Sequence, residues 1–239
     1  MVEKLPKIKW DPIVDDKPNT TSPRIRFSQE FTNENQRKSN GNVLDLGCGT
    51  GSFTFIVDRE GCVGIDLRIN ALKIAKKYCK SSEFIVSSAF NLPFRDETFD
   101  IVFMWEVLEY LRPGSETKLI QEVHNVSTPR AQLFLSAPNY HLLHNIFDPD
   151  YVLRRQRHFK LSELITVISK KGFSIKRFYV RGGWNTIIAT NIFYFFKHAF
   201  HKKDVKILKY FEKKSEAELN SKKNGATNIF IAAERKPDD

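Results

Sequence analysis

Three glycines stand at alternating positions after a short apolar run, in the stretch VLDLGCGTG at residues 43–51. Asp45 lies within that run, and Gly47, Gly49 and Gly51 follow it. Glycine has no Cβ, so it adopts positive φ easily and lets a ligand come close to the backbone. Such a turn between a strand and a helix delivers its ligand to the N-terminus of the helix. The stretch is typical of a nucleotide-type site, although ordinary turns share the bare glycine spacing.

Two other nucleotide-binding turns do not fit this stretch. A dinucleotide site has the pattern GxGxxG, but the residue three positions after Gly49 is Ser52. A P-loop ends in Gly-Lys-Ser or Gly-Lys-Thr, and no such sequence follows. The sequence therefore disfavours both the nicotinamide-dependent enzymes and the P-loop NTPases.

A second carboxylate follows about twenty residues later, at the end of the apolar run CVGID. Asp66 at the end of a strand can accept hydrogen bonds from both hydroxyls of a ribose. An isolated aspartate in such a position is most often a helix cap. Its spacing from the glycine turn favours the ribose-binding role.

These stretches resemble motifs of class I S-adenosylmethionine-dependent methyltransferases. VLDLGCGTG resembles the first motif of that family, and SSAFNLPFRDETFDIV at 87–102 resembles the pattern GDAxxLPFxDxxFDxV of its small-molecule branch (methyltransferase type 11, ubiquinone-biosynthesis-like). Three later stretches also resemble family sequences: WEVLEYL, EVHNVSTPRAQLFLSAPN and RHFKLSELITVISKKGFSI. The resemblance covers about residues 42–180.

The chain departs from the family pattern at three places. Ser88 stands where the family generally has an aspartate that accepts from the adenine amino group, and a serine makes a weaker contact there. Tyr110 replaces a histidine, and Arg130 and Ala131 replace a pair of glycines.

The resemblance implies S-adenosyl-L-methionine as the cofactor and no metal. It also implies that the backbone NH of Ala89 reaches the adenine ring. The cofactor-binding residues that it implies are Asp45, Gly47, Cys48, Gly49, Gly51, Asp66, Leu67, Ser88, Ala89 and Trp105.

None of these residues would remove a proton from an acceptor hydroxyl. Histidine suits that task because its pKa lies near neutrality. A long irregular loop is predicted at 139–159. It contains His141, His144, Asp148 and His158 and should open at the ligand end of the sheet. We take His141 and His158 as the candidate bases. In the alternative interpretation, His141 and His144 are ordinary loop residues, and Arg157 and His158 begin a helix.

Alternating apolar runs and helical patterns place these residues on successive βα units. The expected fold is α/β, a Rossmann-like class I methyltransferase fold with a mostly parallel seven-stranded sheet and helices on both faces. Strands are predicted at 42–47, 62–66, 83–87, 99–105, 131–137, 173–180 and 228–235, and helices at 69–79, 115–126 and 161–171, with a short helix through Val57.

The predicted domain organisation has three parts. Residues 1–40 form an N-terminal arm interrupted by prolines, in which only 24–31 can form a helical turn or two. Residues 41–239 form the methyltransferase domain. Residues 182–224 are an insertion that a minimal domain would not need.

Charge is distributed unevenly along the chain. Residues 151–239 carry 20 Lys and Arg against 8 Asp and Glu, a net charge of +12, whereas residues 1–150 carry −2. The excess indicates an anionic partner: a phosphate-bearing substrate, an acidic lipid surface or nucleic acid. A lysine-rich surface that serves only solubility is the alternative.

The insertion contains WNTIIATNIFYFFKHAF at 184–200, a helix that would be apolar nearly all round. It is too short to span a bilayer but long enough to lie in its interface, and basic residues follow it. The hypothesis is an acceptor-side lid that receives a hydrophobic or lipid-linked substrate near an anionic membrane surface. A packing helix or a contact between subunits is the alternative.

Cysteine content and apolar runs bear on localisation. Cys48, Cys62 and Cys79 are an odd number without disulfide or zinc spacing. The N-terminus has no apolar run typical of a signal peptide, and no stretch is long enough to span a membrane. A cytoplasmic protein is expected, or one that is peripheral to the membrane.

The predicted function is methyl transfer to a small-molecule or lipid-linked acceptor, on oxygen. RNA or protein methylation is the first alternative; the [DN]PP[YF] signature of base methylation is absent, and SAPNY at 136–140 has one proline. A silent cofactor-binding module is the second. A basic nucleic-acid-binding protein ranks last, because no reader motif is recognisable. The sequence does not predict the oligomeric state.

Overall fold

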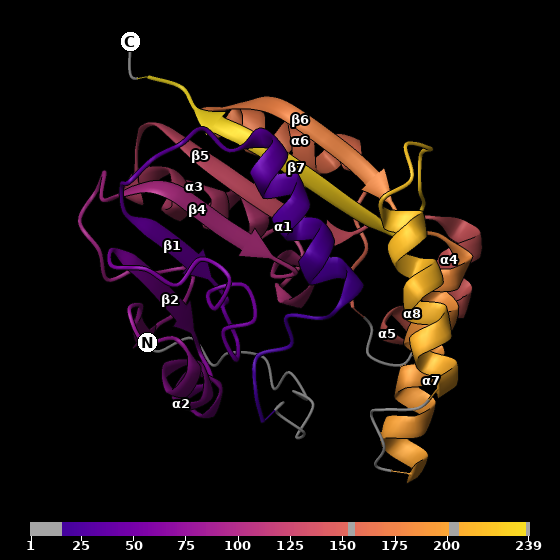
Figure 1. Cartoon of the computed structure of the whole chain (residues 1–239). Coiled ribbons are helices and arrows are strands. Elements are labelled where there is room, and N and C mark those ends of the chain that lie inside the picture. Colours follow the sequence, from indigo (N-terminus) through magenta and orange to yellow (C-terminus); the bar gives the residue numbers. More distant parts are fainter. Residues whose placement is uncertain (1–15, 153–155, 201–205, 238–239) are drawn as a thin grey trace.

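The computed structural model describes residues 16–152, 156–200 and 206–237. Its centre is a seven-stranded sheet in the order β3-β2-β1-β4-β5-β7-β6 (Figure 1). β7 runs antiparallel to both of its neighbours, and the other pairs are parallel. The mostly parallel sheet predicted from the sequence is therefore confirmed. The strands are β1 (Val43–Leu46), β2 (Cys62–Asp66), β3 (Glu83–Val86), β4 (Phe99–Trp105), β5 (Ser127–Pro138), β6 (Phe173–Arg181) and β7 (Asn228–Arg235).

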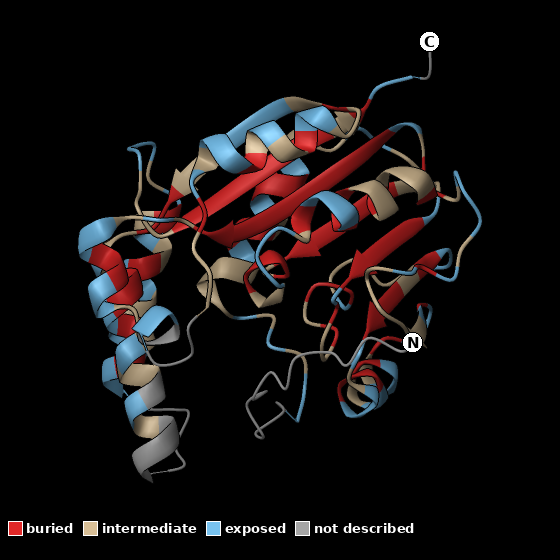
Figure 2. Cartoon of the chain, turned by 180° about the vertical axis from the view of Figure 1, so that it is seen from behind, coloured by how far each residue is buried: buried red, intermediate tan, exposed pale blue. Residues whose placement is uncertain are grey.

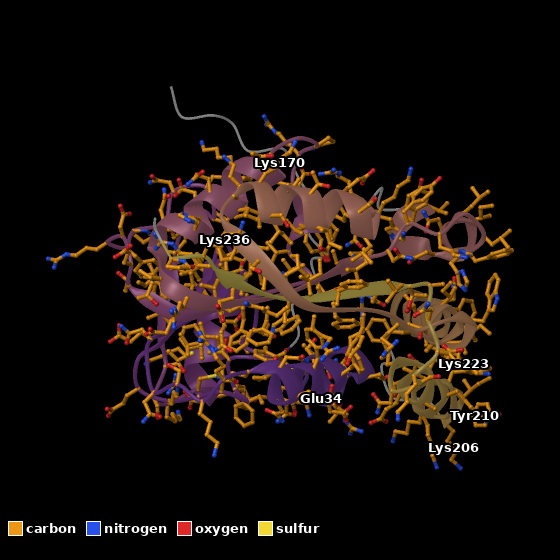
Figure 3. The ribbon with its side chains drawn as sticks, turned by 90° about the horizontal axis from the view of Figure 1, so that it is seen from above. Glu34, Lys170, Lys206, Tyr210, Lys223 and Lys236 are labelled. Carbon is orange, nitrogen blue, oxygen red and sulfur yellow. The ribbon has the colours of Figure 1, made fainter. Side chains whose placement is uncertain are left out.

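Helices cover both faces of the sheet and extend past one end of it. Seen from above, Glu34 in one helix and Lys170 in another lie on opposite sides of the strands (Figure 3). The helices are α1 (Pro23–Asn35), α2 (Ile69–Tyr78), α3 (Glu116–Val126), α4 (Leu142–Phe147), α5 (Pro149–Val152), α6 (Leu161–Lys170), α7 (Trp184–Phe200) and α8 (Lys206–Leu219), with a 3-10 turn at Leu108–Tyr110.

The core has two layers, one on each face of the sheet. β4 lies between them and is buried on both faces, as its nearly continuous apolar sequence predicts. Side chains of a strand alternate between the two faces of the sheet. Val102 and Met104 pack in the layer that includes α3 and α6, whereas Ile101, Phe103 and Trp105 pack in the layer that includes α1. The central strands are accordingly buried along most of their length (Figure 2).

The helix in the N-terminal arm is longer than the one or two turns predicted at 24–31. α1 buries Phe27 and Phe31, and the ring centroids of Phe27 and Phe230 are 4.6 Å apart. The aromatic contacts stabilise a helix that its own sequence favours weakly. The division of the chain at residue 40 stays a prediction.

The short helix predicted through Val57 is wrong: residues 49–56 form consecutive turns, and Val57 lies in a bend. Gly51 has a φ of +81° there, outside the right-handed helical region. The hydroxyl of Thr54 donates to the carboxylate of Asp45 at 2.5 Å. Serine and threonine in this stretch thus bond outside a helical pattern, which competes with helix formation.

Arg130 occupies one of the positions where the family has glycine, and its φ is +65°. A left-handed backbone of this kind costs a non-glycine residue roughly 1–2 kcal/mol. The fold therefore keeps the glycine-like conformation although the glycine is gone.

The segment after β5 contains α4 and α5 and is not the irregular loop predicted at 139–159. Its two ends are joined, because Asn139 and Phe159 form an isolated parallel bridge. The amide of Tyr140 donates to the carbonyl of Phe159 at 2.8 Å, and the amide of Phe159 donates to the carbonyl of Pro138 at 2.9 Å. The chain thus leaves the sheet and returns to the same point.

The insertion forms two helices that lie side by side beyond the end of the sheet (Figure 1). Glu218 of α8 accepts hydrogen bonds from the backbone amides of Asn185 and Thr186, both at 3.0 Å. The first amides of a helix have no partner within the helix, and a carboxylate there is also favoured by the helix dipole. Glu218 therefore caps α7 from the neighbouring helix.

Candidate active site

The predicted glycine turn lies at the carboxyl end of β1 and has the expected backbone. Gly47, Gly49 and Gly51 have φ values of +75°, +56° and +81°. A Cβ on Gly47 would lie 2.7 Å from Val107, and one on Gly51 would lie 2.9 Å from Cβ of Ala75. Both conformation and space therefore require glycine at these two positions.

Asp45 lies under this turn, buried within β1. Burial raises the pKa of its carboxyl from 3.8 to about 6, with the nearby Asp66 adding to the rise and the hydrogen bond from Thr54 opposing it. Removing the charge from water disfavours the ionised form. A cationic ligand group that approached Asp45 would have the opposite effect.

Asp66 ends β2, the strand next to β1, so the two carboxylates stand at the same edge of the sheet. Its carboxylate accepts from the amide of Gly49 at 3.0 Å and from the amide of Arg68 at 2.8 Å. The guanidinium of Arg68 also pairs with it, with Nε 3.2 Å from Oδ1. The predicted ribose-binding carboxylate thus links the glycine turn to the start of α2.

Cys48 lies within the turn, and its side chain is buried. A Cβ on Gly64 would lie 2.9 Å from its sulfur, so the thiol faces β2. Burial raises the pKa of the Cys48 thiol well above its usual value and raises those of Cys62 and Cys79 to about 12. All three cysteines are free thiols that stay protonated and unreactive.

The residues expected beside an adenine ring lie near the open edge of the sheet. Leu67, directly after Asp66, is exposed. Ser88 and Ala89 follow β3, the edge strand, and are half-buried. The hydroxyl of Ser88 accepts from the amide of Phe90 at 3.2 Å. An apolar side chain and polar backbone are therefore available at this edge.

Trp105 ends β4 and is buried against Phe53, with ring centroids 5.2 Å apart. Its indole nitrogen is buried and has no hydrogen-bond partner among the described residues. Such a donor is costly to leave unpaired. Together with two carboxylates at neighbouring strand ends and a glycine turn open to close approach, this donor fits a polar nucleoside ligand.

The two candidate bases have different surroundings. The amide of His141 donates to Asn145 Oδ1 at 3.2 Å, and Nδ1 of His158 lies 2.8 Å from the same oxygen. Since Asn145 Oδ1 accepts in both contacts, the proton of this hydrogen bond is on Nδ1 of His158, and Nε2 is the nitrogen that can act as a base. Asp148 Oδ2 lies 3.7 Å from that Nε2 and would stabilise the protonated ring.

His141 pairs instead with His144, with their Nδ1 atoms 2.7 Å apart. The ring of His144 lies over Trp184 of α7, with centroids 4.5 Å apart. Burial lowers the pKa of His144, and the neighbouring His141 lowers it further. This pair thus ties α4 to the insertion.

A pocket opens beside His158, between α1, the ends of β5 and β7, and α7. Its lining is polar apart from Pro138 and Ile187 and includes Arg24, Asp148, Gln156, His158, Thr190 and Asn228. Arg24 also pairs with Glu106, which follows Trp105, at 3.0 Å. Glu106 accepts in addition from the hydroxyl of Ser136 at 2.6 Å. Arg24 therefore joins the pocket to the end of β4 through its ion pair with Glu106.

Sequence reasoning missed Arg24, Glu106 and the threonines of α7. Arg24 lies in the arm, outside the stretches that resemble the family. Glu106 has a φ of +53°, a strained value that no sequence pattern indicates. Its place directly after the β4 strand was the one available signal.

The sequence comparison agrees with the geometry. Residues 43–130 match the model of a family described as "Methyltransferase domain". That stretch runs from β1 into β5 and contains all the predicted cofactor-binding residues.

Individual relatives and structures extend the comparison. The chain is 30% identical over 120 residues to norajmaline N-methyltransferase of Rauvolfia serpentina, covering 46% of this chain and 40% of that protein. It is 31% identical over 115 residues to probable tRNA methyltransferase 9B of Homo sapiens, covering 47% and 24%. The matches span about half of the length of the first curated relatives or less, 34 to 58%. A structure of a SAM-dependent methyltransferase from Methanosarcina mazei superposes with a TM-score of 0.60 at 18% identity, covering 86% of this chain and 97% of that one, which shows the fold.

Proposed function

The chain carries a class I S-adenosylmethionine-dependent methyltransferase domain, and from this premise we propose that it methylates an oxygen of a small-molecule or lipid-linked acceptor. The cofactor of this family, S-adenosyl-L-methionine, supplies a methyl carbon that its sulfonium already activates. The residues of the chain must then hold the cofactor, orient the acceptor and remove one proton.

The strand ends support the cofactor part of this proposal. Asp66 would accept from ribose hydroxyls once Arg68 moves aside, and Asp45 would attract a cationic amino group. Leu67, Ser88 and Ala89 would line the adenine ring. The backbone of the glycine turn would lie directly against the ligand, and Cys48 would contribute its peptide group. Trp105 would gain a partner for its indole nitrogen.

The contacts of His158 favour it over His141 as the base. Nδ1 of His158 lies 2.8 Å from Asn145 Oδ1, and a carboxylate oxygen of Asp148 lies 3.7 Å from its Nε2. It also lines a pocket that Arg24 connects to the end of β4. A hydroxyl that entered the pocket could give its proton to Nε2, and Asp148 would stabilise the resulting imidazolium.

The lining of the pocket supports a hydroxyl-bearing acceptor group. Its polar side chains can bond hydroxyls, whereas an apolar substrate would leave them unpaired. α7, which lines the pocket, also carries exposed apolar residues, and so does α4. An acceptor with a polar head and an apolar portion would match both surfaces.

One observation carries the proposal: two carboxylates and a glycine turn lie at the carboxyl ends of adjacent strands, and a pocket lined by His158 lies at the end of β5, two strands further along the sheet. To test it, the purified protein is incubated with methyl-labelled S-adenosylmethionine and an extract of the producing organism. The label is then counted in organic-soluble, small aqueous, protein and nucleic-acid fractions.

Label in either of the first two fractions, absent with Asp45→Ala, is the expected result, and mass spectrometry of the product then identifies the methylated atom. Cofactor binding without label in any fraction would favour a silent module. Failure to bind the cofactor would overturn the whole proposal.

RNA is the second candidate acceptor. The similarity to a probable tRNA methyltransferase and the net charge of +12 over residues 151–239 favour it. Label in the RNA fraction, together with binding that falls steeply with salt, would replace the small-molecule acceptor by RNA.

A further inference from the structure

α4 has its polar and apolar sides reversed. Its two central polar residues, His144 and Asn145, are buried, whereas Leu142, Leu143, Ile146 and Phe147 are 57–65% exposed. A helix on the surface of a water-soluble protein normally buries its apolar residues. Single exposed apolar residues are common, but four in one short helix indicate a surface with a partner.

The exposed apolar surface continues onto the neighbouring helices. Tyr151 and Val152 of α5 are exposed, as are Trp184, Ile188 and Phe195 of α7. The rings of Phe147 and Trp184 are in contact, with centroids 5.6 Å apart, and Asn191 donates to the carbonyl of Phe147 at 2.9 Å. We call the exposed apolar residues of α4, α5 and α7 the apolar end surface.

Basic residues accompany this surface at the same end of the molecule. α8 packs beside α7, and Lys206, Lys209, Lys213 and Lys214 of α8 are exposed. Lys206, Tyr210 and Lys223 project from that end in the view from above (Figure 3). Lysines near an anionic membrane are attracted by its negative surface potential. Exposed tryptophan and tyrosine are also typical of the membrane interface.

No helix among the described residues is long and apolar enough to cross a bilayer. A surface that combines protruding apolar side chains with exposed lysines fits the interface of an anionic membrane instead. We propose that the apolar end surface inserts into the headgroup region of an anionic lipid bilayer while the lysines of α8 contact the headgroups. A second protein surface would need acidic groups opposite these lysines, whereas anionic lipid supplies the charge and the apolar phase together.

This contact would place the pocket beside His158 next to the membrane, because α7 lines both. It does not depend on methyl transfer, since binding to vesicles requires neither cofactor nor acceptor. Failure of the transfer assay would therefore leave it standing, and absence of vesicle binding would leave the transfer reaction standing.

The test is co-sedimentation of the full chain with vesicles of phosphatidylcholine, with and without 30% phosphatidylglycerol. We expect binding to the anionic vesicles that weakens as salt rises. Ile146→Asp/Phe147→Asp should lower the partition coefficient at least tenfold at unchanged melting temperature. Lys213→Glu/Lys214→Glu should lower it less and remove most of the salt dependence.

The matched control is Ile69→Asp, which adds a charge at an exposed apolar residue of α2 and should leave vesicle binding unchanged. α2 packs on β2 and β3, at the opposite edge of the sheet from β6, which leads into α7. Size-exclusion chromatography with light scattering decides the main alternative. If the wild-type chain forms an oligomer that Ile146→Asp/Phe147→Asp dissociates, and vesicles do not bind, the surface is a contact between copies and the proposal is overturned. Binding that is equal for wild-type and variant would overturn it as well.

Discussion

The proposed cofactor side and the proposed acceptor side of this molecule are built in different ways. On the cofactor side, strand ends and backbone turns place the functional groups, as for Asp45, Asp66 and Gly49. On the acceptor side, helices outside the sheet place them, and His158 depends on Asn145 and Asp148 from the segment between β5 and α6. A site at strand ends keeps the geometry of the sheet, whereas a helical site can change while the sheet stays the same.

The largest effect is expected at the candidate base. His158→Gln should lower kcat about 10²- to 10⁴-fold, because a positioned general base contributes that much. Cofactor affinity should stay the same, since His158 lies on the acceptor side. The measurement is single-turnover transfer to the acceptor identified by labelling, together with calorimetry of cofactor binding. A similar loss in His141→Gln with full activity in His158→Gln would assign the base to His141.

On the cofactor side, Asp66→Ala should weaken S-adenosylmethionine binding about 100-fold, because two hydrogen bonds to a charged group are lost. Isothermal titration calorimetry measures this affinity directly. Glu60→Ala removes an exposed carboxylate nearby in sequence and is the control. Unchanged affinity in Asp66→Ala would show that the ribose lies elsewhere.

Asp45 connects pH to both stability and binding. Its folded pKa of about 6 lies above the unfolded value of 3.8, so the ionised form is disfavoured by folding. The resulting destabilisation is absent below pH 3.8, develops as pH rises to 6 and is complete above it. Asp45→Asn should therefore raise the free energy of unfolding by about 1–3 kcal/mol at pH 7.5, and by much less near pH 4.

Denaturant unfolding at the two pH values measures this difference. The same variant should lose cofactor affinity at pH 7.5. In the wild type, affinity should fall as pH drops below 6, because the protonated carboxyl no longer attracts a cationic group. A stability gain that is the same at both pH values would contradict the assigned pKa.

The smallest effect is expected where the two sides meet. Arg24→Ala should raise the KM for the acceptor roughly 3- to 10-fold and leave cofactor affinity unchanged. Arg26→Ala is closely matched: Arg26 lies on the same helix, is also about half exposed, and pairs with Glu216 at the same distance of 3.0 Å. Equal behaviour of the two variants would separate Arg24 from the acceptor pocket.

The sheet and the cofactor side could be predicted because their signals are local. β4 is a run of apolar residues, and the glycine turn with its flanking aspartates occupies adjacent positions in the chain. Asp66 required only a spacing from that turn. The ion pair between the guanidinium of Arg68 and the carboxylate of Asp66 could not be predicted.

The contacts of the proposed acceptor side could not be predicted, because they join residues that are far apart in the sequence. His158 is oriented by Asn145, thirteen residues away, and Arg24 meets Glu106 across 82 positions. The sequence of α4 is mostly apolar and predicts that its apolar residues are buried, yet its polar residues face inward. The direction of such a short helix depends on what it packs against, and periodicity alone does not encode that.

The bridge between Asn139 and Phe159 has a consequence for how such a protein can evolve. The two ends of the segment 140–158 are held at one point of the sheet, so a change of length between them need not change the register of β5 or the position of α6. The contacts of His144 and Phe147 with Trp184 are the ones that such a change would have to keep. If this segment contacts the acceptor, as we propose, we expect that exchanging it for that of a relative changes acceptor choice and leaves cofactor binding intact.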